Sequence, residues 1–341
     1  MPGEFLGEGL IFIISQPRAG STLLQRMLSG HPDIATAAEP WLLLHPLYGL
    51  RQHGIQAEYN SQWAFKAVRA FLNEHADGAE TYRDGLRAFA ATVYGAALAR
   101  QGKRIFLDKT PRYYFIIPEL RTLFPQASVI LLLRNPLAVL HSILTTWVKG
   151  DWPRLAQHAA DLRVAPVRIA DAIQTQGDAA IVVRYEDLAT EPQACLAGLC
   201  ERLGLAPHAE MLTYGQRAAP SGRLGDQIGI QQHDRPVPDH LTEWQALAGD
   251  AQMRHFAQAY LDELGEATLN RLGYPQDELA AALTGRDQVS WLSPLAPWNV
   301  VLRPASTWTR RERWQVARAQ AVQAAGPWRG AWNFLRSRVP V

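Results

Sequence analysis

Residues 11–22 read Ile-Phe-Ile-Ile-Ser-Gln-Pro-Arg-Ala-Gly-Ser-Thr, and this stretch decides the fold. Its first part continues from Leu10 as a short apolar run, which is typical of a buried parallel strand. Its second part, residues 16–22, is a tight loop with a glycine, and a helix is predicted to follow over residues 21–29. A strand, a glycine loop and a helix together point backbone N–H groups and the helix dipole at one spot. The stretch therefore predicts an anion-binding loop at the end of a strand.

The loop departs from the pattern of nucleotide triphosphatases, G-x-x-x-x-G-K-[ST]. Ser15 stands at the first glycine, and Gly20 and Thr22 match the second glycine and the hydroxyl. Ser21 replaces the lysine, which normally reaches the β and γ phosphates. The loss of that lysine disfavours ATP or GTP hydrolysis and favours a ligand with a shorter phosphate chain. The alternative is that Pro17 and Gly20 only shape the turn between strand and helix, and that no ligand binds there.

Strands and helices alternate along the rest of the chain. Apolar runs predict strands over residues 104–107, 128–133 and 179–183. Helices are predicted near residues 118–123, from Pro136 onward, over 192–203 and over 244–272. This alternation predicts an α/β fold, a P-loop-type three-layer fold with a central parallel sheet flanked by helices. Ligands of such sheets bind at the carboxyl ends of the strands.

The composition limits the class of protein. A chain of 341 residues with 48% hydrophobic residues can build one large α/β domain or two smaller ones. The net charge of +2 is too small to indicate a nucleic-acid partner. Cys195 and Cys200 form neither a zinc-site pattern nor a disulfide framework, and we see no signal peptide and no run of about 20 apolar residues. We expect a cytoplasmic protein, at most peripheral to a membrane.

A second anion site is predicted at the end of the strand over residues 128–133. Arg134 follows this strand directly, and Ser142 lies eight residues further on, two turns into the next helix. A guanidinium and a helix hydroxyl can together hold a terminal phosphate. Beside an anion loop on a neighbouring strand, this pair indicates a nucleotide with phosphates at both ends of its ribose.

With these two elements the chain resembles the sulfotransferases that use 3′-phosphoadenosine 5′-phosphosulfate, PAPS, and most of all the tyrosylprotein-sulfotransferase-like bacterial branch. The matched stretches are residues 12–39, 108–144 and 181–192. The resemblance implies sulfuryl transfer from PAPS to a hydroxyl, or less often an amine, without a metal. It implies that Arg134 and Ser142 hold the 3′-phosphate. It also implies that the 5′-phosphosulfate lies on the loop residues Pro17, Arg18, Ala19, Gly20, Ser21 and Thr22, although Ala19 stands where the family often has serine.

The same resemblance assigns the catalytic groups. Glu39 lies 21 residues after Arg18, at the position of the catalytic glutamate, and is the expected general base. Lys109 matches the lysine that stabilises the sulfuryl oxygens and the leaving phosphate, and Arg18 is expected to share that role. Two alternatives stay open: a solvated Glu39, and a purely structural ion pair between Glu39 and Lys109. Other conceivable bases are the histidines His31, His141 and His233.

Two further nucleotide contacts rest on weaker matches. Tyr185 matches a tyrosine that lies near the nucleotide in the family, and a role in the core is its alternative. Residues 213–240 are rich in Gly, Pro, Asp and Gln and are predicted to form a long functional loop. Within it, Arg235 would correspond to a basic residue that closes over the nucleotide, and Gly225-Asp226 would shape the loop.

The resemblance predicts one sulfotransferase domain over residues 1–290, with a helical insertion over about 41–101. Residues 291–341 form a basic, Trp-rich extension with eight arginines from Arg303 to Arg338 against one acid, Glu312. Such a tail suits an anionic membrane face or an acceptor, and packing on its own domain is the alternative. We expect a small molecule, a lipid or a glycan as the acceptor. The sequence gives neither the identity of this acceptor nor the oligomeric state. The competing functions are a P-loop-type small-molecule kinase and a nucleotide-binding module without catalysis.

Overall fold

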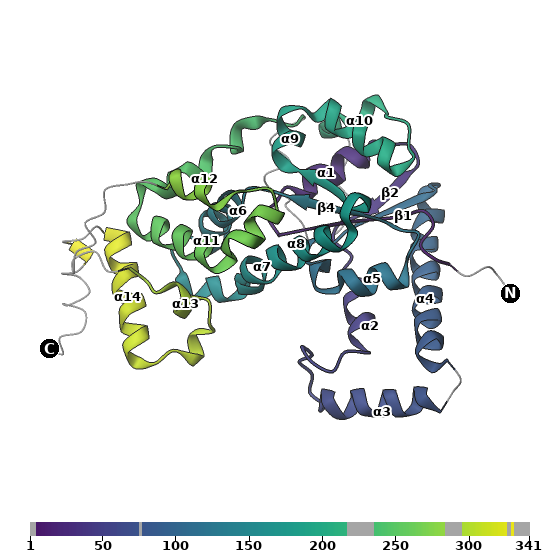
Figure 1. Ribbon diagram of the computed structural model, residues 1–341, viewed down its shortest axis with the longest axis horizontal. Coiled ribbons are helices and arrows are strands. Elements are labelled where there is room, and N and C mark those ends of the chain that lie inside the picture. Colours follow the sequence, from purple (N-terminus) through teal and green to yellow (C-terminus); the bar gives the residue numbers. More distant parts are fainter. Residues whose placement is uncertain (1–4, 75–76, 217–234, 284–294, 326–328, 331–341) are drawn as a thin grey trace.

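A parallel sheet organises the computed structural model, which describes residues 5–74, 77–216, 235–283, 295–325 and 329–330. In this described part the sheet has five strands in the order β2-β3-β1-β4-β5, all parallel (Figure 1). The strands are β1 (Leu10–Ser15), β2 (Ile34–Ala37), β3 (Ile105–Lys109), β4 (Ser128–Leu133) and β5 (Ile181–Arg184). Their carboxyl ends therefore meet at one edge, where every motif of the sequence analysis was expected.

The side chains of β1 alternate between two apolar layers. Phe12 and Ile14 lie in the larger core cluster, whereas Ile11 and Ile13 lie in a second cluster on the other face. This alternation follows from the period of two along a strand. Both faces of the sheet are therefore buried, which confirms the predicted α/β fold with three layers.

Helices cover both faces. The helices are α1 (Ser21–Leu28), α2 (Leu44–Tyr48), α3 (Ser61–Asn73), α4 (Gly78–Gln101), α5 (Ile117–Leu123), α6 (Pro136–Ile143), α7 (Ala159–Arg163), α8 (Ala165–Gln176), α9 (Tyr185–Thr190), α10 (Pro192–Leu203), α11 (Ala251–Arg271), α12 (Gln276–Ala281), α13 (Trp298–Val301) and α14 (Arg310–Ala325). Residues of α4, α5, α6, α8 and α11 join the larger cluster, and residues of α1, α9 and α10 join the second.

Strand β2 is the main element that the sequence prediction lacks. It has four residues, Ile-Ala-Thr-Ala, and alanine has little preference for strands. Pairing with β3 holds it in place, with Ile34 opposite Ile105 and Ala37 opposite Asp108. β2 matters for the site because it ends two residues before Glu39.

Two predicted helical regions are divided in the structure, and for the first of them the sequence already predicts the break. Residues 62–101, expected as a helical region interrupted around Asp77 and Gly78, form α3 and α4, and Asp77 between them has a left-handed backbone, φ 59°. The region over residues 244–272 forms a 3-10 helix, Glu243–Gly249, and then α11, whose N-cap is Asp250. Asp250 accepts a hydrogen bond from Met253 N at 2.8 Å, which starts the second helix separately.

The described part of the C-terminal extension packs on the body. The Trp298 ring lies 5.5 Å from Phe256 and 5.9 Å from Tyr260, both on α11, measured between ring centroids. Trp308 is buried, and Trp314 on α14 is 37% exposed. Residues 291–294, 326–328 and 331–341 lie outside the described residues, so the boundary at 290 stays a prediction. No helix in the described ranges has the length and apolar composition needed to cross a bilayer.

Candidate active site

The loop between β1 and α1 turns sharply because two of its residues have a left-handed backbone. Arg18 has φ 71° and Gly20 has φ 93°. A Cβ at Gly20 would lie 2.3 Å from Cδ2 of Tyr185, so the ring and the backbone angle both require glycine here. Helix α1 begins at the next residue, Ser21, and no side chain caps it; the N–H groups of Leu23 and Leu24 donate to the Gly20 carbonyl, and those of Ser21 and Thr22 come before them at the helix start. This is the geometry of the predicted anion site.

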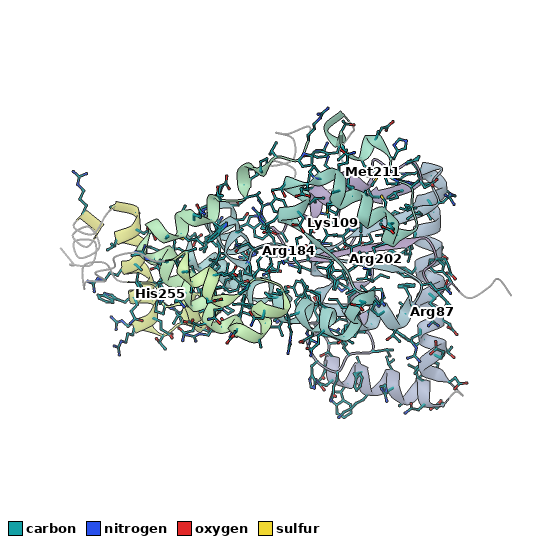
Figure 2. All side chains as sticks on the ribbon, turned by 45° about the horizontal axis from the view of Figure 1, so that its top comes forward. Arg87, Lys109, Arg184, Arg202, Met211 and His255 are labelled. Atoms are coloured by element: carbon teal, nitrogen blue, oxygen red, sulfur yellow. The ribbon has the colours of Figure 1, made fainter. Side chains whose placement is uncertain are left out.

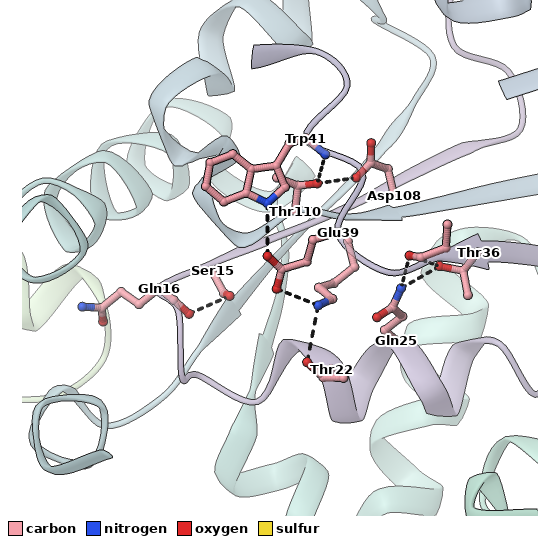
Figure 3. A network of polar contacts seen from close by, with 11 residues as sticks. Ser15, Gln16, Thr22, Gln25, Thr36, Glu39, Trp41, Asp108 and Thr110 are labelled. Carbon is pink, nitrogen blue, oxygen red and sulfur yellow. Dashed lines mark hydrogen bonds and ion pairs between the residues drawn. The ribbon is translucent and has the colours of Figure 1, made fainter. Parts of the chain in front are cut away.

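Glu39 and Lys109 meet beside this loop. Lys109 is the last residue of β3, and Glu39 follows the neighbouring parallel strand β2. Lys109 Nζ lies 2.9 Å from Glu39 Oε1 and donates to Thr22 Oγ1 of α1 at 3.4 Å (Figure 3). The Lys109 side chain is 0% exposed and lies in the middle of the body (Figure 2), whereas the Glu39 side chain is 15% exposed. Three residues from separate motifs thus form one polar cluster.

The contact between Glu39 and Lys109 is the ion pair that the sequence left open as an alternative. A buried ammonium needs a partner, and Glu39 provides it here. The pair does not lie in an apolar core, however, because Lys109 also contacts Thr22 at the start of α1. An anion bound at that helix start would offer Lys109 a second partner, so the pair is compatible with a structural and with a catalytic role.

Trp41 holds the other oxygen of Glu39. Its indole Nε1 donates to Glu39 Oε2 at 3.2 Å (Figure 3). Trp41 itself has a left-handed backbone, φ 55°, which is costly for a bulky residue. Its backbone N–H donates to Thr110 Oγ1 at 3.3 Å, and that hydroxyl donates to Asp108 Oδ1 at 2.7 Å. The hydrogen bonds of Thr110 therefore fix the loop that carries Glu39.

Asp108 anchors this arrangement from inside the protein. Its side chain is fully buried, and burial raises the pKa of the carboxyl, although its hydrogen bonds act in the opposite direction. Tyr94 on α4 and Tyr113 donate to Oδ2 at 2.7 and 3.0 Å. Asp108 thus joins α4, β3 and the loop after β2 directly behind Lys109.

Arg18, Arg134 and Ser142 form a second cluster on the other side of the loop. Arg134 Nη1 donates to the Arg18 carbonyl at 3.0 Å, and Arg18 Nε donates to Ser142 Oγ at 3.0 Å. Arg134 also lies 4.3 Å over the ring of Tyr185, and burial lowers the pKa of its guanidinium. The structure brings these predicted residues together. It places the Arg18 side chain against Ser142, while Lys109 is the cation that contacts Glu39.

The other predicted residues are less closely tied to these clusters. Arg235 is exposed at the start of a described segment, while Gly225-Asp226 and His233 lie outside the described residues. His31 is buried and accepts from Asp33 N at 3.1 Å. His141 is half-buried on α6, and burial lowers its pKa. In the described ranges, no group of three or more His, Cys, Asp or Glu side chains is arranged to hold a metal ion.

The end of the long loop contributes a contact that sequence reasoning missed. Arg134 Nη2 donates to the carbonyl of His240 at 3.0 Å. His240 Nδ1 lies 2.9 Å from Oε1 of Glu243 in the following 3-10 helix. The sequence placed this loop near the nucleotide but gave no sign that a backbone carbonyl meets Arg134.

Asp161 is the other group that sequence reasoning missed. It lies on α7, is 1% exposed, and accepts two hydrogen bonds from Arg112, at 2.8 and 2.6 Å. Tyr114 donates to the same carboxylate at 2.9 Å. Burial alone would raise the pKa of Asp161, but hydrogen bonds from His158, Arg112 and Tyr114 outweigh it and hold the pKa below its usual range. No motif marks Asp161, because its partners are distant in sequence.

Comparisons with known proteins identify the family of the chain. A family model described as "Sulfotransferase family" matches residues 11–210. Nodulation protein NoeE of Sinorhizobium fredii (strain NBRC 101917 / NGR234) is 32% identical over 291 residues, which cover 78% of this chain and 66% of that protein. Protein-tyrosine sulfotransferase 2 of Gallus gallus is 24% identical over 279 residues, which cover 78% of this chain and 69% of that protein.

A solved structure adds a likeness in the fold. The sulfotransferase domain from the Synechococcus PCC 7002 olefin synthase is similar with a TM-score of 0.50 and 26% identity. The match covers 77% of this chain and 93% of that domain. The nodulation protein is the longer molecule, since the aligned part of this chain spans only 66% of its length.

Proposed function

The chain belongs to the sulfotransferase family, as its motifs predicted, and we propose that it transfers a sulfuryl group from PAPS to the hydroxyl of a small molecule, a lipid or a glycan. The observation that carries the proposal is the contact between Lys109 and Glu39, 2.9 Å long, beside Thr22 at the start of α1. It places an acid–base group and a cation together where the loop would hold an anion.

The residues of the loop suit the donor. PAPS carries a 5′-phosphosulfate and a 3′-phosphate, and the two predicted clusters offer one anion site for each. The 5′ end would lie on residues 17–22, at the start of α1, which no side chain caps. The 3′-phosphate would lie between Arg134 and Ser142, which Arg18 now bridges. The donor would take over the hydrogen bond that Arg134 gives to the Arg18 carbonyl and the one that Arg18 gives to Ser142.

The reaction we propose is an in-line displacement. The acceptor oxygen attacks sulfur and forms the new S–O bond, while the bond between sulfur and the 5′-phosphate oxygen breaks. Adenosine 3′,5′-bisphosphate leaves with the electron pair of that bond, and the acceptor proton passes to Glu39. Lys109 would stabilise the charge that develops on the sulfuryl and phosphate oxygens.

This reaction requires Lys109 to change partners. In the structure its ammonium contacts Glu39 Oε1, which would otherwise be the oxygen available to the acceptor. Donor oxygens at the start of α1 would draw Lys109 away and free Oε1, while Trp41 continues to hold Oε2. The base would therefore become available only when the donor is bound.

Ligand-dependent thermal stability tests the donor. We expect adenosine 3′,5′-bisphosphate to raise the melting temperature, because a ligand at about 100 times its Kd stabilises a protein by about 2.7 kcal/mol. ATP should have a much smaller effect, since the loop has Ser21 in place of the triphosphatase lysine. A shift with ATP only would favour the kinase alternative and contradict the proposal.

The acceptor needs a direct search. Incubating the protein with ³⁵S-labelled PAPS and fractionated cell extracts should label a small-molecule, lipid or glycan fraction. Label transferred only to protein tyrosines would contradict the proposed acceptor class while leaving sulfuryl transfer intact. Binding of adenosine 3′,5′-bisphosphate without labelling of any fraction would favour the binding module without catalysis.

A further inference from the structure

Helix α6 does not end as an α-helix. The chain continues into a π-helix over Leu144–Val148, and Lys149 N donates to the Leu144 carbonyl, five residues back, at 2.8 Å. Lys149 has a left-handed backbone, φ 50°, which ends the helix. π-helices are rare, and where they occur they frequently lie at functional sites. This one directly follows the helix that carries Ser142, one of the two residues expected at the 3′-phosphate.

Trp147 on this π-helix contacts Arg18 and His158. The Arg18 guanidinium lies 5.5 Å from the Trp147 ring centroid. The His158 ring is stacked on the same indole, with centroids 4.5 Å apart and planes 25° apart. His158 Nδ1 lies 3.4 Å from Oδ2 of Asp161, the buried carboxylate that also binds Arg112. Trp147 is half-buried, and its stacking on His158 fixes the ring where Arg18 reaches it.

The π-helix explains how Ser142 and Trp147 can both reach Arg18. These two residues are five apart, and in an α-helix with 3.6 residues per turn they would point about 140° apart. A π-helix has wider turns, with hydrogen bonds between residues five apart, and this reduces the angle. The backbone of Arg18 is left-handed, φ 71°, a costly conformation that persists only where the surroundings fix it. One helical segment thus presents a hydroxyl and an aromatic ring to the same guanidinium.

These two contacts of Arg18 respond differently to a bound donor. The Ser142 hydroxyl would turn to the 3′-phosphate and give up the hydrogen bond from Arg18 Nε, which is 3.0 Å long. The Trp147 ring is no ligand for a phosphate, so its contact with Arg18 can persist. An aromatic ring also holds a guanidinium without neutralising its charge, and a stacked guanidinium can still donate from its N–H groups.

We propose that Trp147 is a positioning residue that holds the Arg18 guanidinium beside the sulfuryl group of the bound donor. This role rests on the proposed function, because it needs the sulfuryl group on the loop of Arg18 and the 3′-phosphate at Ser142. Trp147 does not touch the donor and acts through Arg18, whose N–H groups donate to the sulfuryl oxygens. The consequence is a higher affinity for PAPS than Arg18 would give without the ring.

Titration calorimetry with PAPS and with adenosine 3′,5′-bisphosphate tests this role, because only PAPS has the sulfuryl group. Trp147→Leu should lower the ratio of the two affinities, PAPS over the bisphosphate, by about fivefold, as expected for the loss of a half-buried cation–π contact. Trp147→Phe keeps an aromatic ring and should retain most of the ratio. The matched control is Trp314→Leu on α14, where the Arg318 guanidinium lies 5.3 Å from the indole, and it should leave the ratio unchanged.

A double-mutant cycle shows whether Trp147 acts through Arg18. Arg18→Met should lower the same affinity ratio by itself. Adding Trp147→Leu to Arg18→Met should cause no further loss, because the ring then has no guanidinium to hold. Losses that multiply in the double variant would mean that the two residues act independently and would contradict the proposal.

Three further results would overturn the proposal. An unchanged ratio in Trp147→Leu would assign the ring to another partner, such as the acceptor. An equal loss of both affinities would mean that Trp147 only supports the loop. A ratio as low in Trp147→Phe as in Trp147→Leu would show that the aromatic ring is not what holds Arg18. Failure of the proposed function looks different, since the wild type would then bind neither nucleotide. Retained binding of the bisphosphate also shows that each variant is folded.

Discussion

At the scale of single residues, Glu39 has both carboxylate oxygens engaged, by Lys109 on Oε1 and by Trp41 on Oε2. If it is the general base, Glu39→Gln should lower kcat by about a hundredfold or more, because general-base catalysis contributes 10²–10⁴. Binding of adenosine 3′,5′-bisphosphate should persist or tighten, since Lys109 loses its anionic partner. Transfer of ³⁵S and calorimetric titration measure the two effects. Glu201→Gln, an exposed change on α10, is the control. A Glu39→Gln protein with normal kcat would move the base elsewhere.

Arg134 decides whether the second cluster recognises a 3′-phosphate. Arg134→Met should weaken the binding of adenosine 3′,5′-bisphosphate by about 10- to 100-fold, as expected for lost charge-assisted hydrogen bonds. Binding of adenosine 5′-monophosphate should hardly change, because it has no 3′-phosphate. Arg184→Met is a matched control, since Arg184 also ends a strand and lies 4.2 Å over a tyrosine ring, that of Tyr274. Equal losses for both nucleotides would show that Arg134 supports the loop and does not bind the phosphate.

Residues with a chemical motif could be predicted, whereas their supporting partners could not. Lys109, Arg134 and Ser142 were predicted because a fixed spacing or a strand end precedes each of them. Trp41 had no such signal, since its hydrogen bond to Glu39 depends on a left-handed backbone that is unusual for tryptophan. Whether Glu39 and Lys109 form a structural ion pair or a catalytic pair could not be predicted either, because both roles require the same two residues at the same positions.

At the scale of elements, long apolar strands were predictable and the short strand was not. β1 and β4 are runs of six residues that are apolar apart from one terminal serine each, and both were predicted with their observed bounds. β2 depends on its neighbour, since the backbone of β3 supplies its hydrogen bonds and the Leu107 carbonyl accepts from Thr36 Oγ1 at 2.7 Å. The element that carries Glu39 to the site is therefore the one that needs tertiary contacts to form.

The junction of β1 and α1 gives a prediction at the same scale. Gly20→Ala should destabilise the protein by about 3 kcal/mol, because the left-handed backbone costs 1–2 kcal/mol and the new methyl overlaps Tyr185. Urea denaturation measures this loss, and donor binding should fall with it because the loop must shift. Gly85→Ala on α4 is the control: a Cβ there meets nothing within 4 Å, so the change should be neutral or stabilising by up to about 1 kcal/mol. Similar stabilities for the two variants would contradict the tight packing of the loop.

At the scale of the whole molecule, one buried carboxylate connects segments that are far apart in sequence. Asp161 on α7 binds Arg112 and Tyr114, which follow β3, through its side chain. Its carbonyl accepts from Gln16, the residue after β1, at 3.0 Å, and the same amide contacts Tyr260 on α11 at 3.0 Å. The Arg112 guanidinium in turn lies 5.4 Å from the Trp41 ring centroid. Asp161 therefore links the phosphate loop to the side of the site that holds Glu39.

Removing the charge of Asp161 should change how the free energy of unfolding depends on pH, compared with the wild type. At neutral pH, Asp161→Asn leaves the Arg112 guanidinium without its carboxylate and should cost about 3 kcal/mol in the free energy of unfolding. The pKa of Asp161 is lowered in the folded protein, so the unfolded chain binds more protons, and the stability contributed by the carboxylate is present above the ordinary aspartate pKa of about 3.9. It is lost as the pH falls from there through the lower pKa of the folded state.

Urea unfolding at a series of pH values measures this effect. The difference in the free energy of unfolding between wild type and variant should be constant above about pH 5 and should become smaller below about pH 4. The other carboxylates titrate in both proteins and cancel in this difference. A gap that stays constant to the acid limit would mean that Asp161 acts through packing rather than through its charge.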